Sequence, residues 1–167
     1  MNIPPIVECS WGCDPCLEDL VQIFNSSGVD INTQYPPIGY TLCHYAAAGD
    51  WNEIGDGRFS FLLSKLPNVE IRAWPQSDWF LGWDWTVLMV ACMHGTLDKV
   101  QLLVEYGSCV NAVDSLGRSA LMISQYGFDP EGKTSLLLAA GANEHTVDHM
   151  GLSLTDHKNK IAYESAI

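Results

Sequence analysis

Short runs of apolar residues recur along the chain, and each run ends at a glycine. Residues 85–95 and 96–107 form two such runs, and residues 108–117 form a polar segment after them. The same order begins again at residue 118 and continues to Gly151. Thr86 and Ser119 are 33 residues apart, and Ser119 and Ser153 are 34 apart. Two short helices and a loop that return at a fixed period indicate a repeat protein.

The same register extends toward the N-terminus. Residues 39–49 open an earlier unit, residues 4–12 open the first, and residues 20–32 match the second half of the unit that starts at Thr86. We therefore expect one domain over residues 1–167, with about four repeats and a C-terminal half-repeat. The expected starts lie near Pro4, Thr41, Thr86, Ser119 and Ser153.

Two positions in the first helix of each unit support this alignment. One position is apolar in every unit: Ile6, Cys43, Leu88 and Leu121. The position three residues later is always small: Cys9, Ala46, Ala91 and Ser124. A small residue lets neighbouring helices approach closely, while the apolar residue fills the space between units. We expect both sets of side chains to be buried.

Residues typical of helix ends stand where the units require them. Gly28, Gly107 and Gly141 each follow a second helix, which predicts a positive φ at these positions. Asp129 followed by Pro130 predicts a helix that begins with an N-cap and a proline, and Asp14-Pro15 predicts the same earlier in the chain.

These units resemble the ankyrin repeat family. The family's Thr-Pro-Leu-His-x-Ala-Ala run corresponds to residues 41–47, 86–92 and 119–125, and its Gly-Ala-Asp-Val-Asn run to residues 28–32 and 107–111. The resemblance covers about residues 4–160 and implies an all-α solenoid whose hairpin tips and first helices face a partner. His44 is the only histidine kept in the first run, and three of the four opening runs lack its proline. The last unit is polar, as a C-terminal cap requires.

The second repeat is enlarged, because 45 residues separate Thr41 from Thr86. The extra residues fall at 50–57 and at 72–85, and the second insertion holds four of the six tryptophans. Insertions in repeat proteins often form the binding face. Trp79 and Trp83 are therefore expected to contact a partner, whereas Trp85 is expected to pack against the next helix. Alternatively, the insertion folds back and its tryptophans fill the gap that it creates.

The candidate contact residues lie in this insertion and at the hairpin tips. Aromatic anchors beside carboxylates would suit a basic protein. At the tips the alternative is ordinary turn chemistry, in which the same side chains only hold the backbone. The candidates are Trp74, Trp79, Trp83, Asp78, Asp84, Asp114, Leu116, Arg118, Asp148 and Met150.

Composition narrows the choice of partner. Twenty acidic and eight basic residues give a net charge of −12, which disfavours nucleic acid and acidic lipid and favours a basic protein partner or simple solubility.

Apolar residues make up 47% and charged residues 17%, which excludes a disordered chain. No apolar run is long enough to span a membrane, and residues 1–15 do not resemble a signal peptide. We expect a cytoplasmic protein with reduced cysteines.

Three cysteines near the N-terminus offer an alternative chemistry. Cys9, Cys13 and Cys16 have the spacing of the iron–sulfur ligands in radical S-adenosylmethionine enzymes. Those enzymes usually carry an aromatic residue where this chain has Pro15, and they need a barrel-like α/β core. Zinc bound by the three cysteines with a fourth ligand such as His44 is a further alternative. His145 and His149 fall in a hairpin, where helical metal-ligand geometry is not expected. We expect no cofactor.

A stack of helical hairpins presents a long open surface, which suits recognition better than catalysis. We therefore expect a non-enzymatic protein that binds a protein partner, with a metal- or iron–sulfur-dependent protein as the alternative. The binding protein would be an adaptor or a dedicated inhibitor, such as an immunity protein against a basic toxin or nuclease. The charge favours the inhibitor.

Overall fold

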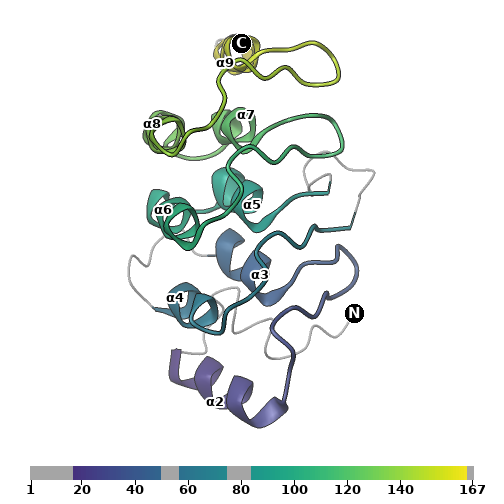
Figure 1. Ribbon diagram of the computed structural model, residues 1–167, viewed down its shortest axis with the longest axis vertical. Helices are drawn as coiled ribbons and strands as arrows, with labels where there is room; N and C mark the ends of the chain where they lie inside the picture. Colours follow the sequence, from purple (N-terminus) through teal and green to yellow (C-terminus); the bar gives the residue numbers. More distant parts are fainter. Residues whose placement is uncertain (1–16, 50–56, 75–83, 165–167) are drawn as a thin grey trace.

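A computed structural model describes residues 17–49, 57–74 and 84–164, and within them the secondary structure is helical apart from three isolated β-bridges. Figure 1 shows two columns of helices: α3, α5, α7 and α9 in the inner column, and α2, α4, α6 and α8 in the outer one. The predicted all-α class is confirmed. The helices are α2 (Leu17–Ser27), α3 (Leu42–Ala48), α4 (Arg58–Leu63), α5 (Val87–His94), α6 (Leu97–Tyr106), α7 (Ala120–Ile123), α8 (Pro130–Ala139) and α9 (Leu154–Glu164), with the 3₁₀ turn η1 (Ser124–Tyr126) after α7.

The inner helices begin at the residues that open the predicted units. Thr41, Thr86 and Ser119 are the N-caps of α3, α5 and α7. The hydroxyls of Thr86 and Ser119 accept hydrogen bonds from backbone N–H groups three residues later. These bonds satisfy donors that have no partner within the helix. Local sequence therefore sets where each inner helix starts.

The outer helices end and begin as predicted. Gly28, Gly107 and Gly141 have positive φ angles of 64°, 97° and 87°. Asp129 accepts a hydrogen bond from the N–H of Gly132, and Pro130 is the first residue of α8. Asp14-Pro15 lies outside the described residues. The inner helix α7 is shorter than α3 and α5. It tightens into η1 where the Ser124 hydroxyl donates to the carbonyl of Leu121.

The core lies between the two columns, and the inner helices α3, α5 and α7 are buried almost completely. The apolar position (Cys43, Leu88 and Leu121) and the small position (Ala46, Ala91 and Ser124) are buried in every described repeat, which confirms both assignments. Ile6 and Cys9 lie outside the described residues. Trp85 is also buried, as predicted for its packing against the next helix.

Consecutive repeats touch at the C-terminal ends of the inner helices. A Cβ added to Gly95 would lie 2.6 Å from the carbonyl oxygen of Ala47, and one added to Gly127 would lie closer still to that of Cys92. Only glycine permits this approach. The carbonyls at these helix ends have no partner within their own helix, so an external donor is needed.

Lysines from the outer helices supply that donor. Lys133 Nζ donates to the carbonyls of Cys92 (2.9 Å) and Gly95 (2.7 Å). Lys99, 34 residues earlier, donates to Ala46 (2.7 Å) and Gly49 in the same manner. Each cation also lies at the negative end of a helix, where it is favoured.

A second set of hydrogen bonds between repeats joins the loops that follow the outer helices. The N–H of Asn68 donates to Asn32 Oδ1 (2.8 Å), and the N–H of Asn143 donates to Asn111 Oδ1 (2.8 Å). Between them, the N–H of Cys109 donates to Glu70 Oε1 (2.9 Å). The enlarged second repeat therefore stacks in the same register as the others.

Replacing Ala91 by leucine should lower the free energy of unfolding by about 1–3 kcal/mol, because the added carbons have no space at the small position. Urea unfolding measures the change. The control is Ala139→Leu, since Ala139 lies on the exposed face of α8. Equal stability of the two variants would contradict the packing described for α3, α5 and α7.

Candidate functional site

Four hairpins project from one side of the stack (Figure 1). In each, the N–H of the first residue donates to the carbonyl of the last: Tyr35 to Tyr40, Ala73 to Trp85, Asp114 to Arg118 and Asp148 to Leu152. The residue before the last always has a left-handed backbone, with φ of 69° at Gly39, 61° at Asp84, 77° at Gly117 and 78° at Gly151. The hairpins therefore share the same closing hydrogen bond and the same left-handed residue, and residues 75–83 of the second lie outside the described residues.

The third hairpin is organised around the buried carboxylate of Asp114. Its Oδ1 accepts the N–H groups of Leu116 and Arg118, both at 2.9 Å. Its Oδ2 accepts hydrogen bonds from Arg118 Nε (2.8 Å) and Trp85 Nε1 (3.1 Å). Asp114 is 4% exposed and Arg118 is 7% exposed.

The fourth hairpin repeats this arrangement with different partners. Asp148 Oδ1 accepts the N–H groups of Met150 (2.8 Å) and Leu152 (2.9 Å). Asp148 Oδ2 lies 3.2 Å from Nε2 of the buried His157, whose Nδ1 is 2.7 Å from the hydroxyl of Tyr126. This network holds α9 against the preceding repeat.

Burial bears on three residues of the predicted contact set. Asp114 and Arg118 direct their charges toward each other, and Asp148 directs its carboxylate toward His157 and the hairpin backbone. This arrangement favours the turn-chemistry alternative for these three residues, and their contact with a partner stays a prediction.

Other candidates remain at the surface. Trp74 is 41% exposed and Met150 is 80% exposed, whereas Leu116 is partly covered. Asp84 is half-exposed and pairs with Arg72 at 3.3 Å. Trp79, Trp83 and Asp78 lie outside the described residues. Sequence reasoning missed Val113 and Val147, which are exposed immediately before Asp114 and Asp148; their one-residue offset from those aspartates was the available signal.

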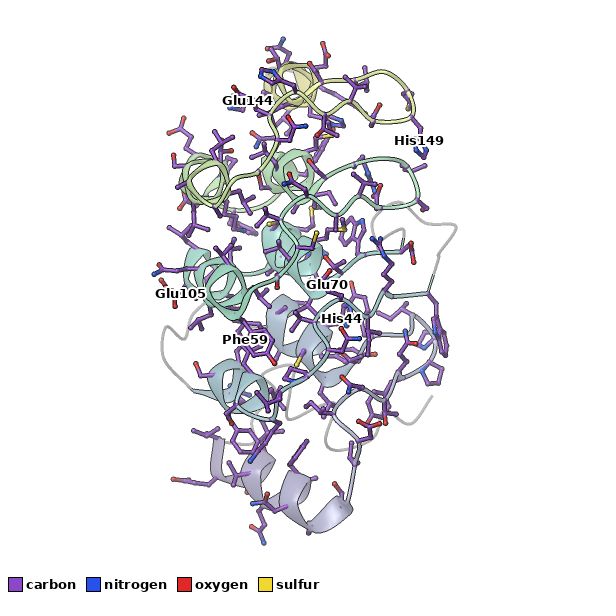
Figure 2. All side chains as sticks on the ribbon, viewed as in Figure 1. His44, Phe59, Glu70, Glu105, Glu144 and His149 are labelled. Atoms are coloured by element: carbon purple, nitrogen blue, oxygen red, sulfur yellow. The ribbon has the colours of Figure 1, made fainter. Side chains whose placement is uncertain are left out.

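Trp74, Val113, Val147 and Met150 thus give the hairpin side a set of exposed apolar side chains, which we call the tip surface. Exposed apolar groups gathered on one side of a protein mark an interaction site more often than scattered ones do. Figure 2 shows His149 on the hairpin side of the stack, whereas Glu105 and Glu144 lie away from that side.

Comparison with known families bears on this geometry. The family described as ankyrin repeats (3 copies) matches residues 69–150. Residues 69–150 belong to the ankyrin repeat family. No curated protein gives a significant match. Ankyrin repeats are generally protein–protein interaction modules, and the tip surface lies on the side where the family resemblance led us to expect a partner.

Within this ankyrin stack, several titratable groups are buried and contribute to the packing. Burial raises the pKa of the Cys43 and Cys92 thiols to about 12, which makes them poor nucleophiles. Burial lowers the pKa of His44 to about 4. The neutral His44 ring accepts the N–H of Thr41 at Nδ1, and its Nε2 lies 3.2 Å from the carbonyl of Trp85, so it joins two repeats.

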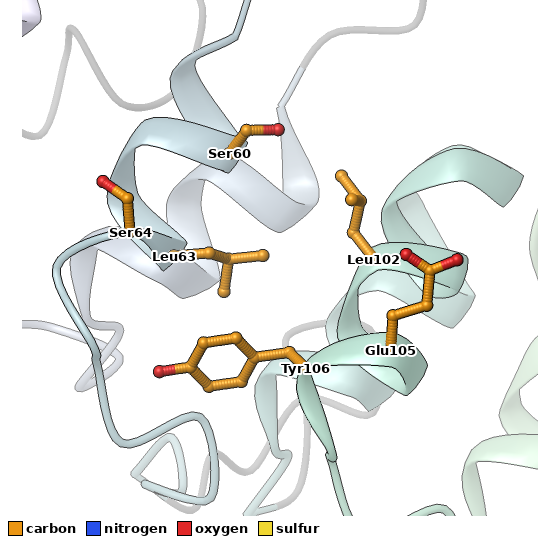
Figure 3. A pocket seen from close by; sticks show the side chains of 6 residues that line it. All are labelled: Ser60, Leu63, Ser64, Leu102, Glu105 and Tyr106. Atoms are coloured by element: carbon orange, nitrogen blue, oxygen red, sulfur yellow. The ribbon is translucent and has the colours of Figure 1, made fainter.

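A pocket of about 350 Å³ opens between α4 and α6 on the outer side of the ankyrin stack (Figure 3). Leu63, Leu102 and the ring of Tyr106 form most of its wall. The Ser64 hydroxyl donates to the carbonyl of Phe61 and the Tyr106 hydroxyl to that of Pro67. These two hydroxyls thus serve the backbone, and Glu105 accepts a hydrogen bond from Gln101.

The metal alternatives rest on residues beyond those described. Cys9, Cys13 and Cys16 lie outside the described residues, and in residues 17–49, 57–74 and 84–164 no three His, Cys, Asp or Glu side chains are placed to share a metal ion. In the same ranges, no helix is both long and apolar enough to cross a membrane.

Replacing Asp114 by asparagine should lower the free energy of unfolding by about 3–5 kcal/mol, because the buried Arg118 guanidinium would lose its counter-charge. Asp84→Asn is the matched control: it removes the charge from a half-exposed pair in the preceding hairpin, and should cost about 1 kcal/mol or less. Thermal and urea unfolding compare the two. Similar small losses would show that Asp114 is not a structural centre.

Protonation of His44 should make stability depend on pH. Its pKa falls from 6.5 to about 4 on folding, so between these values the unfolded chain binds a proton that the folded chain does not. The free energy of unfolding should therefore decrease as pH falls from 6.5 toward 4, by about 3 kcal/mol in total from this group.

Urea unfolding between about pH 7 and pH 4.5 measures this dependence. His44→Gln should flatten the slope, whereas His145→Gln should leave it unchanged, because the His145 side chain is exposed. An unchanged slope in His44→Gln would assign the pH dependence to other groups.

Proposed function

We propose that this ankyrin protein is a non-enzymatic inhibitor that binds a basic protein through the tip surface and covers its active region. An immunity protein against a basic toxin or nuclease is the kind of inhibitor that fits. The observation that carries the proposal is the imbalance of exposed charge: among the described residues, ten acidic side chains but only three basic side chains are exposed.

Five of the eight basic residues are used inside the stack. Lys99 and Lys133 bind helix carbonyls, Arg118 pairs with Asp114, Arg72 pairs with Asp84, and Arg58 is buried. The exposed basic residues are Lys65, Lys158 and Lys160. The exposed acidic residues of the described ranges are Glu18, Asp19, Asp30, Glu70, Asp98, Glu105, Asp129, Glu131, Glu144 and Asp156.

Such a surface attracts a basic partner over long range and repels an acidic one. The tip surface adds apolar anchors that become buried only in a close complex. Charge would then govern the rate of association, and the tips would govern the lifetime of the complex. Both features support a protein with a basic face as the partner.

The test starts with the partner captured from a lysate of the source organism, followed by stopped-flow kinetics on the purified pair. The association rate constant should fall at least about tenfold as salt rises from about 0.01 to 0.1 M, because the Debye length shrinks from about 30 to 10 Å. The joint variant Val147→Ala/Met150→Ala should raise the dissociation rate about tenfold or more without a comparable loss of stability, because both side chains are exposed.

Leu66→Ala is the matched control, since Leu66 is as exposed as Met150 but follows α4, away from the tips. It should leave both rate constants unchanged. A salt-independent association would contradict the basic partner and favour an adaptor with an apolar interface. Unchanged dissociation in the joint variant would place the contact elsewhere.

A further inference from the structure

Twice in the stack, a ring from one hairpin lies on a glycine of the hairpin before it. The N–H of Trp74 donates to the carbonyl of Ile38 (2.8 Å), and its ring occupies the space where Gly39 would carry a Cβ. The N–H of His149 donates to the carbonyl of Leu116 (2.8 Å), and its ring lies 2.6 Å from the Cβ position of Gly117. One backbone hydrogen bond and one ring contact thus recur together.

The contact between the second and third hairpins, which lies between these two, shows why the glycine matters. There the left-handed position holds Asp84, which has a side chain. The residue that corresponds to Trp74 and His149 in the next hairpin is the small Ser115. A ring therefore occurs where a glycine leaves room for it, and a small residue occurs where the position is filled.

The fourth hairpin has the same glycine and carbonyl, but the described residues place no ring on them. Gly151 has a φ of 78°, and nothing lies within 4 Å of its Cβ position. The Met150 carbonyl corresponds to those of Ile38 and Leu116, and no described backbone N–H donates to it. Met150, the residue before Gly151, is exposed, and so is Val147 at the start of the same hairpin, whose His149 is labelled in Figure 2.

We propose that the fourth hairpin receives an aromatic side chain of the protein partner. The partner residue would be extended, its N–H would donate to the Met150 carbonyl, and its ring would lie on Gly151. The partner would continue the row of hairpins, in the way that an added strand extends a sheet edge. This inference deepens the proposed function and rests on it, because it assigns the ring to the proposed partner.

Two glycine variants test the proposed position of the partner's ring on Gly151, which we call the ring seat. Gly151→Ala places a methyl group where the ring would lie. Gly141→Ala imposes the same left-handed strain, since Gly141 has a φ of 87° and equally open surroundings, but it lies after α8, away from the hairpin. Both variants should lose similar stability, and only the first should lose the seat.

The first measurement needs no partner. The ¹⁵N-labelled chain is titrated with N-acetyltryptophanamide in the millimolar range, with N-acetylalaninamide as the control probe. Saturable shifts should appear at the amides of residues 149–152 in the wild type and in Gly141→Ala, and should be lost in Gly151→Ala. No tryptophan-specific shift at these amides, or equal shifts in Gly151→Ala, would overturn the ring seat.

The second measurement uses the partner captured for the proposed function. Gly151→Ala should weaken its binding about tenfold, and Gly141→Ala should not. Equal binding by both variants would overturn the inference while leaving salt-dependent binding, and hence the proposed function, intact. If binding of the partner does not depend on salt but the shifts at residues 149–152 are present, the proposed basic partner would be contradicted and the ring seat on Gly151 would be retained.

Discussion

The stack depends on how closely one repeat can approach the exposed carbonyls at the C-terminal end of the inner helix before it. At Gly95 and Gly127 any side chain would force the repeats apart. At Lys99 and Lys133 a cation satisfies carbonyls that have no partner in their own helix. Close approach then allows the small and apolar positions of α3, α5 and α7 to fill the space between repeats. Packing and hydrogen bonding therefore impose the same spacing.

That constraint also shapes the outer surface. Basic side chains are needed between repeats and within the hairpins, so few of them remain exposed. The exposed side chains of the described residues consequently carry an excess of acidic groups. The buried carboxylates of Asp114 and Asp148 have a different role, because both hold hairpin backbones that carry exposed apolar residues. Stability and recognition thus draw on one distribution of charge.

The hairpins show where sequence reasoning reached its limit. The sequence places Asp114, Arg118 and Asp148 at or beside hairpin tips; in the structure they are the end residues of the hairpins, and their charges point inward. Whether a tip carboxylate faces solvent or its own backbone depends on the turn conformation and on the residues beneath it, here Trp85 and His157. Those residues are 29 and 9 positions away along the chain, and only the folded stack brings them into contact.

The sequence alone determined the repeat period, the helix starts at Thr41, Thr86 and Ser119, the left-handed glycines and the small position that is buried in every described repeat. These features depend on local propensity and on a spacing that recurs, both of which can be read along one chain. Only the tertiary structure decided which basic residues bond within the stack and which hairpin residues stay exposed. It also decided that a ring lies on Gly39 and on Gly117 but not, among the described residues, on Gly151. Those outcomes depend on contacts between different repeats, and a linear pattern does not specify them.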